Sequence, residues 1–452
     1  QQLAVANAIN KGFSIIAGGP GTGKTYTVVK LLAALVMLEQ QGLAQQLEGA
    51  AIRIALVAPT GKAAQRLSES VLSAVKGFRG QIDDTILDAL PNQAQTLHRL
   101  LGVLPNQANF KHHQLNKLAL DVLLIDEVSM VDLALMNRLL LALPAKTKVI
   151  LLGDADQLPS VAAGSVLADI APRPHMGFSR ANLAYLSAIT GYKALPKAKK
   201  QPADHLVILT KSRRFDGQGG IGLLAQAVIA GQSQESWQLL AQDNSQLHLL
   251  SMSLSTWLPK LVEQYYQAIF RCTELSEAFL LLSRFRILSA THKGEYGVEN
   301  INKLVVNLLQ RRGFITDPNG IFHGQPIMIS ENDYGIGLFN GDIGLIWRHP
   351  SGHLMAVFED NSTAEQDFNW LMPSRLPKFT TVYAMTIHKT QGSEFEHVAM
   401  ILPQQSDNKL LSRELLYTGI TRAKTELSIA SPSHVWRQGV EAKVQRYSGL
   451  SL

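Results

Sequence analysis

The feature that most constrains the fold of this chain is the run GGPGTGKT at residues 18–25, which matches the phosphate-loop pattern G-x-x-x-x-G-K-[ST]. An apolar run at 13–17 precedes it and a helix-compatible segment follows it, which is the strand-to-helix setting that such a loop needs. Glycines allow backbone N–H groups to turn toward phosphates, a lysine supplies charge, and a threonine hydroxyl can bind Mg²⁺. The pattern therefore predicts a site for ATP and Mg²⁺, and its candidate residues are Gly18, Gly19, Pro20, Gly21, Thr22, Gly23, Lys24 and Thr25.

The size and composition of the chain indicate a globular protein with several domains. Its 452 residues are 46% hydrophobic, which is enough for two to four domains at about 100–200 residues each. No apolar run approaches the roughly 20 residues that cross a bilayer, so we expect no membrane segment and a cytoplasmic location. The single cysteine, Cys272, excludes an internal disulfide and a zinc site built on several cysteines. A net charge of +6 permits binding to a polyanion without requiring it.

Alternating strand-like and helix-compatible segments predict an α/β fold with parallel sheets. In the first part of the chain the strand-like runs are 13–17, 52–58, 122–125 and 149–152. A proline-containing stretch at 171–204 interrupts this pattern and is the candidate linker. We therefore expect a first domain at 1–204 that includes the linker.

A second α/β unit is expected to begin near residue 205 and to resume after an insertion. Its strand-like runs are 205–209, 382–385, 398–402 and 427–430. Between them, short strand-like runs broken by glycines occupy 322–378 and predict a small inserted β-barrel. The second domain is thus expected at 205–321 and 379–452, with the barrel at 322–378.

Two adjacent carboxylates, Asp126 and Glu127, follow the apolar run 122–125. The C-terminal end of a parallel strand lies at the sheet edge where the phosphate loop is expected. There Asp126 can bind Mg²⁺ through its water shell, and Glu127 can orient and deprotonate the water that attacks the γ-phosphate. The alternative is an Asp-Glu pair that only begins a helix. Together with the phosphate loop, the pair favours nucleotide hydrolysis over binding alone.

Three further polar residues are candidates for the hydrolytic step. Gln157 lies within GDADQLP after the run 149–152 and can sense the γ-phosphate, although an ordinary Asp-rich turn has a similar composition. Arg214, expected in the second domain, and Arg422, after a glycine turn, are candidate arginine fingers. Taken singly, each arginine fits a surface ion pair better. The candidate catalytic residues are Lys24, Glu127, Gln157, Arg214 and Arg422, and the candidate metal ligands are Thr25 and Asp126.

In this order the motifs resemble those of superfamily 1B helicases, most closely the RecD family, over nearly the whole chain. APTGKAA at 58–64 and TLHRLL at 96–101 resemble DNA-contacting motifs, and TIHKTQGSE at 386–394 resembles motif V. Asp126 and Glu127 resemble motif II, Gln157 lies in motif III, and Arg214 and Arg422 match the arginines of motifs IV and VI. By this resemblance, nucleotide-binding candidates also include Gln1, Gln391, Gly392 and Glu394, and the DNA-binding candidates are Thr60, Lys62, His98, Thr386, His388 and Lys389.

The resemblance implies two RecA-like P-loop motor domains, with ATP in the cleft between them and an SH3-like β-barrel inserted in the second. It also implies ATP-driven movement along single-stranded DNA in the 5′ to 3′ direction. RecD is the α subunit of RecBCD, or exodeoxyribonuclease V, so the implied partners are RecB and RecC in DNA double-strand break repair and recombination. RecD subunits of that complex carry a partner-docking domain before the motif whose adenine-reading glutamine Gln1 resembles. Because the sequence begins at that motif, we expect that it is either a fragment or lacks that domain.

Other functions stay open at the level of sequence. A stand-alone superfamily 1B helicase would have the same chemistry, and partner binding separates it from a RecBCD subunit. A nuclease is a weak alternative, because Glu441-Ala442-Lys443 has no upstream acidic partner on a strand. A subunit that uses ATP only as a switch is disfavoured by Glu127 and by the two candidate arginines.

Overall fold

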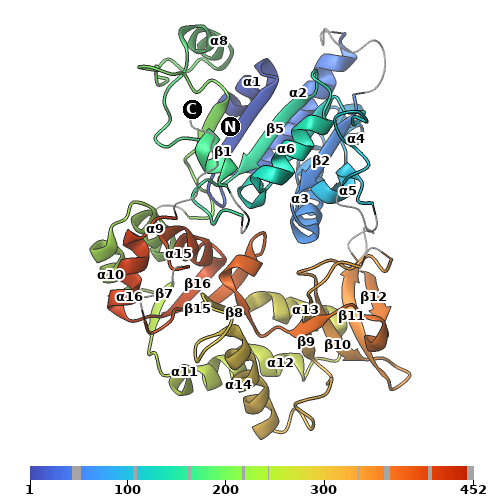
Figure 1. Cartoon of the computed structure of the whole chain (residues 1–452), viewed down its shortest axis with the longest axis vertical. Helices are drawn as coiled ribbons and strands as arrows, with labels where there is room; N and C mark the ends of the chain where they lie inside the picture. The colour runs from blue at the N-terminus through green and yellow to red at the C-terminus, as the bar shows by residue number, and fades with distance from the viewer. Residues whose placement is uncertain are drawn as a thin grey trace. The chain divides into compact units, whose positions relative to one another are not determined.

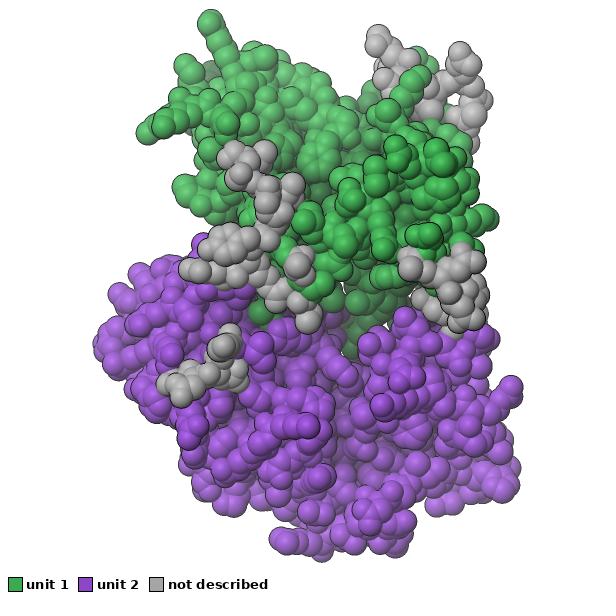
Figure 2. Space-filling view, viewed as in Figure 1, with its two compact units in different colours: residues 1–214, 445–452 green, residues 215–444 purple. Residues whose placement is uncertain are grey.

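The computed structural model describes residues 1–42, 52–104, 109–160, 162, 164–215, 219–242, 244–333, 335–360, 367–405 and 410–444. The described residues divide into two compact units, the first reaching Arg214 and the second running from Phe215 to Val444 (Figures 1 and 2). Each unit contains a parallel β-sheet with flanking helices, which confirms the predicted α/β class. Within the described ranges, no helix combines the length and the apolar character needed to cross a bilayer.

The first unit is built on a six-stranded sheet in the order β3-β2-β4-β5-β1-β6, and all its pairings are parallel. Its strands are β1 (Phe13–Gly18), β2 (Ile54–Ala58), β3 (Ala94–Thr96), β4 (Val122–Ile125), β5 (Lys148–Gly153) and β6 (Leu206–Leu209). Its helices are α1 (Gln2–Asn10), α2 (Lys24–Gln40), α3 (Gly61–Phe78), α4 (Asp84–Asp88), α5 (Leu97–Leu101), α6 (Leu133–Ala142), α7 (Val166–Ile170) and α8 (Arg180–Thr190), with a 3₁₀ turn η1 (Val128–Met130). The strands expected from the apolar runs at 13–17, 52–58, 122–125 and 149–152 are therefore confirmed.

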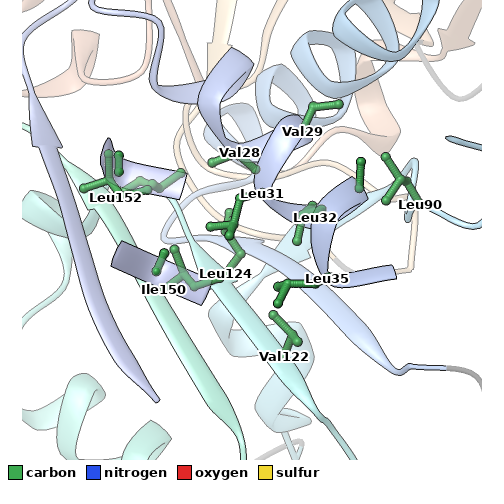
Figure 3. Packing of buried hydrophobic residues seen from close by; sticks show 14 of the residues in the cluster. Val28, Val29, Leu31, Leu32, Leu35, Leu90, Val122, Leu124, Ile150 and Leu152 are labelled. Carbon is green, nitrogen blue, oxygen red and sulfur yellow. The ribbon is translucent and has the colours of Figure 1, made fainter. Parts of the chain in front are cut away.

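The sheet of the first unit is buried on both faces. In β4, Val122 and Leu124 join the core beneath α1, α2 and α3, whereas Leu123 and Ile125 join the core beneath α5 and α6. Figure 3 shows the first of these cores, where the apolar side of α2 packs on β4 and β5. Successive strand residues point to opposite faces, so a run that is apolar at every position fits only a strand covered on both sides.

Two expectations about the end of this unit are wrong. The run 205–209 was expected to begin the second unit, but β6 pairs in parallel with β1, because Leu206 completes one core and Val207 and Leu209 complete the other. The stretch 171–204 was expected to be a linker, but it contains α8, which packs on α1 through the buried Leu186.

The second unit has a five-stranded parallel sheet in the order β14-β8-β15-β16-β7. Its strands are β7 (Leu247–Leu250), β8 (Phe285–Ser289), β14 (Ala384–Thr386), β15 (Phe395–Ile401) and β16 (Ala423–Ala430). Its helical segments are α9 (Gly220–Ile229), α10 (Ser233–Ala241), α11 (Leu254–Leu261), η2 (Val262–Tyr266), α12 (Gln267–Ile269), α13 (Leu275–Arg284), α14 (Val298–Arg311), η4 (Ile387–Thr390), α15 (Arg413–Ile420) and α16 (Ser433–Glu441). The strands expected near 382–385, 398–402 and 427–430 are present as β14, β15 and β16.

An antiparallel sheet is inserted in the sequence between α14 and β14. Its five strands have the order β12-β11-β10-β9-β13 and are β9 (Gln325–Ile329), β10 (Ile343–Arg348), β11 (Leu354–Asp360), β12 (Asp367–Leu371) and β13 (Phe379–Thr381), with η3 (Pro373–Arg375) before the last. Ile327, Ile346 and Phe358 lie in a core of its own. The short strands expected within 322–378 are thus present, and their closure into an SH3-like barrel stays a prediction.

Candidate functional site

The phosphate loop joins β1, which ends at Gly18, to α2, which begins at Lys24. The Lys24 ammonium donates hydrogen bonds to the carbonyl oxygens of Gly18 (2.7 Å) and Gly19 (3.2 Å), and the Thr22 hydroxyl also donates to Gly19 O (2.8 Å). No side chain caps the first turn of α2 at its N-cap residue, Gly23. A 17-residue helix therefore presents backbone N–H groups and the positive end of its dipole beside a lysine, an arrangement that suits a phosphate.

Gly21 and Gly23 have a backbone that other residues rarely adopt, with φ of 74° and 79°. Gly23 also lacks room for a side chain, because a Cβ atom there would collide with Nε2 of Gln1. The Gln1 amide donates to the Thr22 carbonyl (3.3 Å). The fold thus brings the predicted nucleotide-binding glutamine onto the phosphate loop.

The segment that follows β6 lies against the same loop. The Ser212 hydroxyl donates to the carbonyl of Pro20 (2.9 Å), and the Arg213 N–H donates to the carbonyl of Gly21 (2.8 Å). A Cβ atom on Gly21 would lie 2.5 Å from Cβ of Arg214. Arg214 was expected in the second domain, but it belongs to the first unit, because β6 is an edge strand of the first sheet.

Asp126 and Glu127 lie directly after β4. The Asp126 N–H donates to Val57 O (2.9 Å), and the Glu127 N–H donates to Oδ1 of Asp126 (2.8 Å). Burial raises the pKa of Asp126, and the positive charge of Lys24 opposes that rise, so the two groups are close enough to interact. Glu127 has φ 52°, and it is the one residue other than glycine with positive φ in the described part of the chain. That conformation costs about 1–2 kcal/mol, which is common at functional sites.

Gln157 lies in the turn after β5 and is held by Asp154. The fully buried Asp154 carboxylate accepts hydrogen bonds from the Gln157 side-chain amide (3.3 Å) and from the Asp156 N–H (3.1 Å). The other amide atom, Oε1 of Gln157, is buried without a hydrogen-bond partner among the residues that the structure describes. This oxygen can therefore accept a hydrogen bond from a bound water. Sequence reasoning assigned no role to Asp154, although its position directly after a β-strand was a usable signal.

The DNA-binding candidates of the first unit lie at helix starts. Thr60 caps α3 by accepting from the Ala63 N–H (3.2 Å), and Lys62 lies in the first turn. His98 lies in α5, makes an edge-on contact with the Phe110 ring (5.8 Å between centroids), and has a pKa lowered by partial burial. Capping accounts for Thr60 on structural grounds alone, and the DNA contacts of this group stay predictions.

The second unit repeats this cap. Thr386 ends β14 and caps η4 by accepting from the Lys389 N–H (3.4 Å), which places His388 in the same short helix. Partial burial lowers the pKa of Lys389. The turn that follows contains the nucleotide-binding candidates Gln391, which is buried, Gly392, with φ 72°, and Glu394, whose carboxylate lies 3.9 Å from the Lys424 ammonium.

Arg422 is only 3% exposed, so a surface ion pair does not describe it. Its guanidinium donates to the carbonyl oxygens of Thr418 (3.0 Å) and Ser393 (3.1 Å) and to the hydroxyl of Thr421 (3.3 Å). Its own carbonyl accepts from the Phe395 N–H (2.9 Å). The arginine therefore fixes the turn before β16 to the turn before β15, and Thr418 and Ser393 are positioning residues that sequence reasoning missed.

The contacts of Glu441, the carboxylate on which the weak nuclease alternative depends, do not support a nuclease site. Glu441 is the last residue of α16, and its carboxylate accepts from the Ser233 hydroxyl (2.7 Å) at the start of α10. This contact joins two helix ends and gives the carboxylate a structural role.

The residues of the first unit fit the phosphates of a nucleoside triphosphate with its metal ion. Thr25 is in the first turn of α2, and Asp126 lies within electrostatic reach of the neighbouring Lys24. A hydroxyl and a carboxylate are oxygen ligands of the kind that Mg²⁺ accepts together with phosphate oxygens. The unpartnered Gln157 oxygen and the strained Glu127 lie after neighbouring strands of the same sheet, where a water could be oriented.

Comparisons with known proteins show which family the chain resembles. Residues 1–163 match the family described as AAA domain, and residues 381–430 match the UvrD-like helicase C-terminal domain. The RecBCD enzyme subunit RecD of Haemophilus influenzae is 38% identical over all of this chain and 71% of its own length. RecD of Mycolicibacterium smegmatis is 35% identical over all of this chain and 74% of its own length. The ATP-dependent RecD2 DNA helicase of Deinococcus radiodurans is 28% identical, covering 94% of this chain and 47% of its own length.

Solved structures with a detectable likeness include Pif1 helicases. The Candida albicans protein covers 99% of this chain and 96% of its own, with 15% identity and a TM-score of 0.49. The Bacteroides protein, in complex with ADP-AlF3 and single-stranded DNA, covers 98% and 94%, with 18% identity and a TM-score of 0.48.

Proposed function

The chain belongs to the RecD family, and from this membership we propose that it is an ATP-dependent DNA helicase that moves 5′ to 3′ along single-stranded DNA. The observation that carries the proposal is the match to RecD subunits over the whole chain, together with a phosphate loop whose neighbours include a carboxylate pair and a glutamine. We further propose that its two parallel sheets are RecA-like motor domains, that the inserted sheet is an SH3-like barrel, and that the protein acts with RecB and RecC.

In the hydrolytic step the residues of the first unit divide the work. Thr25 and Asp126 would hold Mg²⁺, which when bound neutralises charge on the β- and γ-phosphates. Lys24 exchanges its loop carbonyls for phosphate oxygens, because a charged acceptor binds an ammonium more strongly than a carbonyl does. Gln157 and Glu127 orient the attacking water, and Glu127 accepts its proton.

Arginines and DNA contacts complete the proposal. Arg214 lies beside the phosphate loop and would supply charge to the transition state. The family resemblance assigns the same role to Arg422, whose guanidinium would have to give up its hydrogen bonds to Thr418, Ser393 and Thr421 to play it. The predicted DNA contacts come from both units, and Gln391, Gly392 and Glu394 connect the DNA-binding turn of the second unit to nucleotide binding. Candidate DNA-contacting residues are Thr60, Lys62, His98, Thr386, His388 and Lys389.

The catalytic part of the proposal is tested with Lys24→Ala. Wild-type protein should hydrolyse ATP faster when oligodeoxythymidylate is added, and the variant should lose this turnover by about 10²–10³-fold, since the charge on the γ-phosphate is removed. Lys30→Ala is a matched control, because Lys30 lies on the exposed side of the same helix over the Tyr26 ring. A Lys24→Ala protein with unchanged DNA-stimulated turnover would refute the motor assignment.

Polarity and partner dependence are tested on forked DNA with one tail at a time. We expect strand separation on duplexes with a 5′ tail and none on those with a 3′ tail, and preference for the 3′ tail would overturn the direction. Adding RecB and RecC to the same assay separates a RecBCD subunit, whose unwinding they increase, from a stand-alone helicase, which they leave unchanged.

A further inference from the structure

A basic surface on the first unit has no part in the proposed motor site. It consists of Arg180, Lys193, Lys197, Lys199 and Lys200, all exposed, on and after α8. Residues 174–203 contain these five basic residues and no aspartate or glutamate, a local charge of +5 with histidine neutral, against +6 for all 452 residues. Nearly the whole excess charge of the chain is therefore concentrated in 30 residues.

The backbone under this surface is fixed by hydrogen bonds. The Phe178 N–H donates to Pro196 O (2.8 Å), and the Ala198 N–H donates back to Phe178 O (3.0 Å). The Ala203 N–H donates to Gly177 O (2.8 Å), and Phe178 itself is buried in the core. The segment that carries the lysines is thus hydrogen-bonded to the residues before α8. It is a folded part of the first unit and not a flexible linker between domains (Figure 1).

The charges of the basic surface are not neutralised within the described residues. None of its five side chains forms an ion pair with a described carboxylate, in contrast to Arg53 and Arg79, which pair with aspartates. The next carboxylate along the chain, Asp204, is already engaged by Ser179, through its N–H (2.8 Å) and its hydroxyl (2.6 Å), and by Lys11 at 3.8 Å. Like charges held together without counterions raise the local potential and attract a polyanion.

Two exposed apolar side chains belong to the same stretch of chain as these charges. Ile189 is 62% exposed near the end of α8, and Tyr192 is 51% exposed just after it, next to Lys193. Lysines around an exposed aromatic ring are the combination that binds single-stranded nucleic acid, since ammonium groups contact phosphates and a ring stacks on a base. An acidic protein partner would match the charge but gives no reason for the exposed ring.

We propose that the basic surface binds the phosphate backbone of single-stranded DNA as a second contact, outside the residues assigned to the motor. It holds DNA by charge and by the Tyr192 ring, without reading sequence. The proposal rests on the proposed DNA-dependent motor function. Such a contact would raise affinity for DNA without changing the rate of hydrolysis once DNA is saturating, because none of its residues is among those assigned to nucleotide binding or hydrolysis.

The test compares two double charge reversals by fluorescence anisotropy with a fluorescein-labelled 40-base oligodeoxythymidylate. Lys199→Glu/Lys200→Glu should weaken binding by about tenfold, and should lower the slope of log affinity against log salt by about 1.4, at about 0.7 per lost phosphate contact. Lys76→Glu/Lys146→Glu changes the net charge equally at exposed sites outside the surface, and should leave both quantities near wild type. Tyr192→Ala should weaken binding without changing the salt slope.

Two results would overturn the inference: the same loss of affinity in both reversals, or an unchanged salt slope in Lys199→Glu/Lys200→Glu, which would favour an acidic protein as partner. The kcat of ATP hydrolysis at saturating DNA should match wild type in both variants. Failure of the proposed function looks different, because wild-type protein would then hydrolyse ATP at the same rate with and without DNA.

Discussion

The turns that adjoin the two parallel sheets differ in how their polar groups are hydrogen-bonded. In the first unit, the turns after β1, β4 and β5 contain unsatisfied polar groups or a strained backbone. The Gly23 N-cap gives the first turn of α2 no side-chain cap, Oε1 of Gln157 has no partner among the described residues, and Glu127 has positive φ. In the second unit, Arg422 joins the turns before β15 and β16, because its guanidinium donates to Thr418, Thr421 and Ser393, although the Ser393 hydroxyl is itself buried without a partner among the described residues.

This difference suggests that the turns of the first unit bind the nucleotide, whereas those of the second unit transmit a conformational change. A site that must accept phosphates and a water keeps donors and acceptors unsatisfied until the ligand arrives, at a cost in stability. A buried arginine that joins two turns makes them move together, so a change at one turn reaches the other. We infer that the turns of the first unit carry out the chemistry of hydrolysis, and that those of the second unit move together as a rigid body.

The largest expected effect is at Glu127, where activity and stability should change in opposite directions. Glu127→Gln should lower kcat by about 10²–10⁴-fold, because the amide cannot accept the proton of the attacking water. Glu127→Gly should lose the same activity but stabilise the first unit by about 1 kcal/mol, since glycine adopts the left-handed conformation freely. Steady-state ATPase and thermal unfolding measure the two quantities.

Asp132, five residues after Glu127, provides a matched control for these variants. Its carboxylate caps α6 by accepting a hydrogen bond from the Leu135 N–H (2.7 Å). Asp132→Asn keeps that cap and should leave both kcat and stability near wild type. A Glu127→Gly protein that is less stable than wild type would contradict the assignment of strain to this residue.

The next effect concerns Arg422 and tests whether this arginine holds the turns before β15 and β16 together. Arg422→Lys keeps the charge but cannot make all three hydrogen bonds, so it should destabilise the second unit by about 2–3 kcal/mol and also lower kcat. Lys24→Ala should lower kcat with little change in stability. Hydrogen exchange in β15 and β16, measured by mass spectrometry, separates the two cases, and equal protection in both variants would remove the distinction between the units.

A pH effect is expected at His397, on β15. Its ring is 3% exposed and contacts the hydroxyls of Tyr265 (3.0 Å) and Ser428 (2.8 Å). Burial, with the nearby His248, lowers the pKa of His397 to about 4, and this outweighs the Glu426 carboxylate 3.6 Å away.

The unfolded chain, with histidine near pKa 6.5, binds the proton more readily than the folded chain does. Stability of the second unit should therefore be complete above pH 6.5 and fall by about 3 kcal/mol toward pH 4. His397→Gln should remove this part of the pH dependence, measured by urea unfolding at pH 7.0 and 4.5. An identical pH profile in the variant would show that other groups are responsible.

Part of this architecture could be predicted from the sequence. The strands that lead into the phosphate loop and into Asp126 are apolar at nearly every position, and their motifs state what must follow them. The run 206–209 has the same apolar character, but such a run does not say which sheet it joins, and only packing on both cores places β6 beside β1. Helix α8 was missed because Pro174 and Pro196 dominate its surroundings, although Ser179 gives a usable N-cap signal. The hydrogen bonds between Asp154 and Gln157 and between Arg422 and Ser393 depend on distances in the folded chain, which a sequence pattern does not give.

The smallest expected effect is at Thr60 and Thr386, the threonines that cap one helix in each unit. It distinguishes a role in helix capping from a role in DNA binding. Thr60→Ala should destabilise α3 by about 1 kcal/mol, because the Ala63 N–H loses its acceptor, whereas Thr60→Ser keeps the hydroxyl and the cap. Thr386→Ala should have a smaller effect on η4, since its hydrogen bond to the Lys389 N–H is longer, at 3.4 Å. If the hydroxyls also contact phosphate, both alanine variants will weaken binding to oligodeoxythymidylate, and Thr60→Ser will restore it. If Thr60→Ala loses stability but binds DNA as wild type does, the residue is a cap alone, and Lys62 becomes the first candidate for the contact at this helix start.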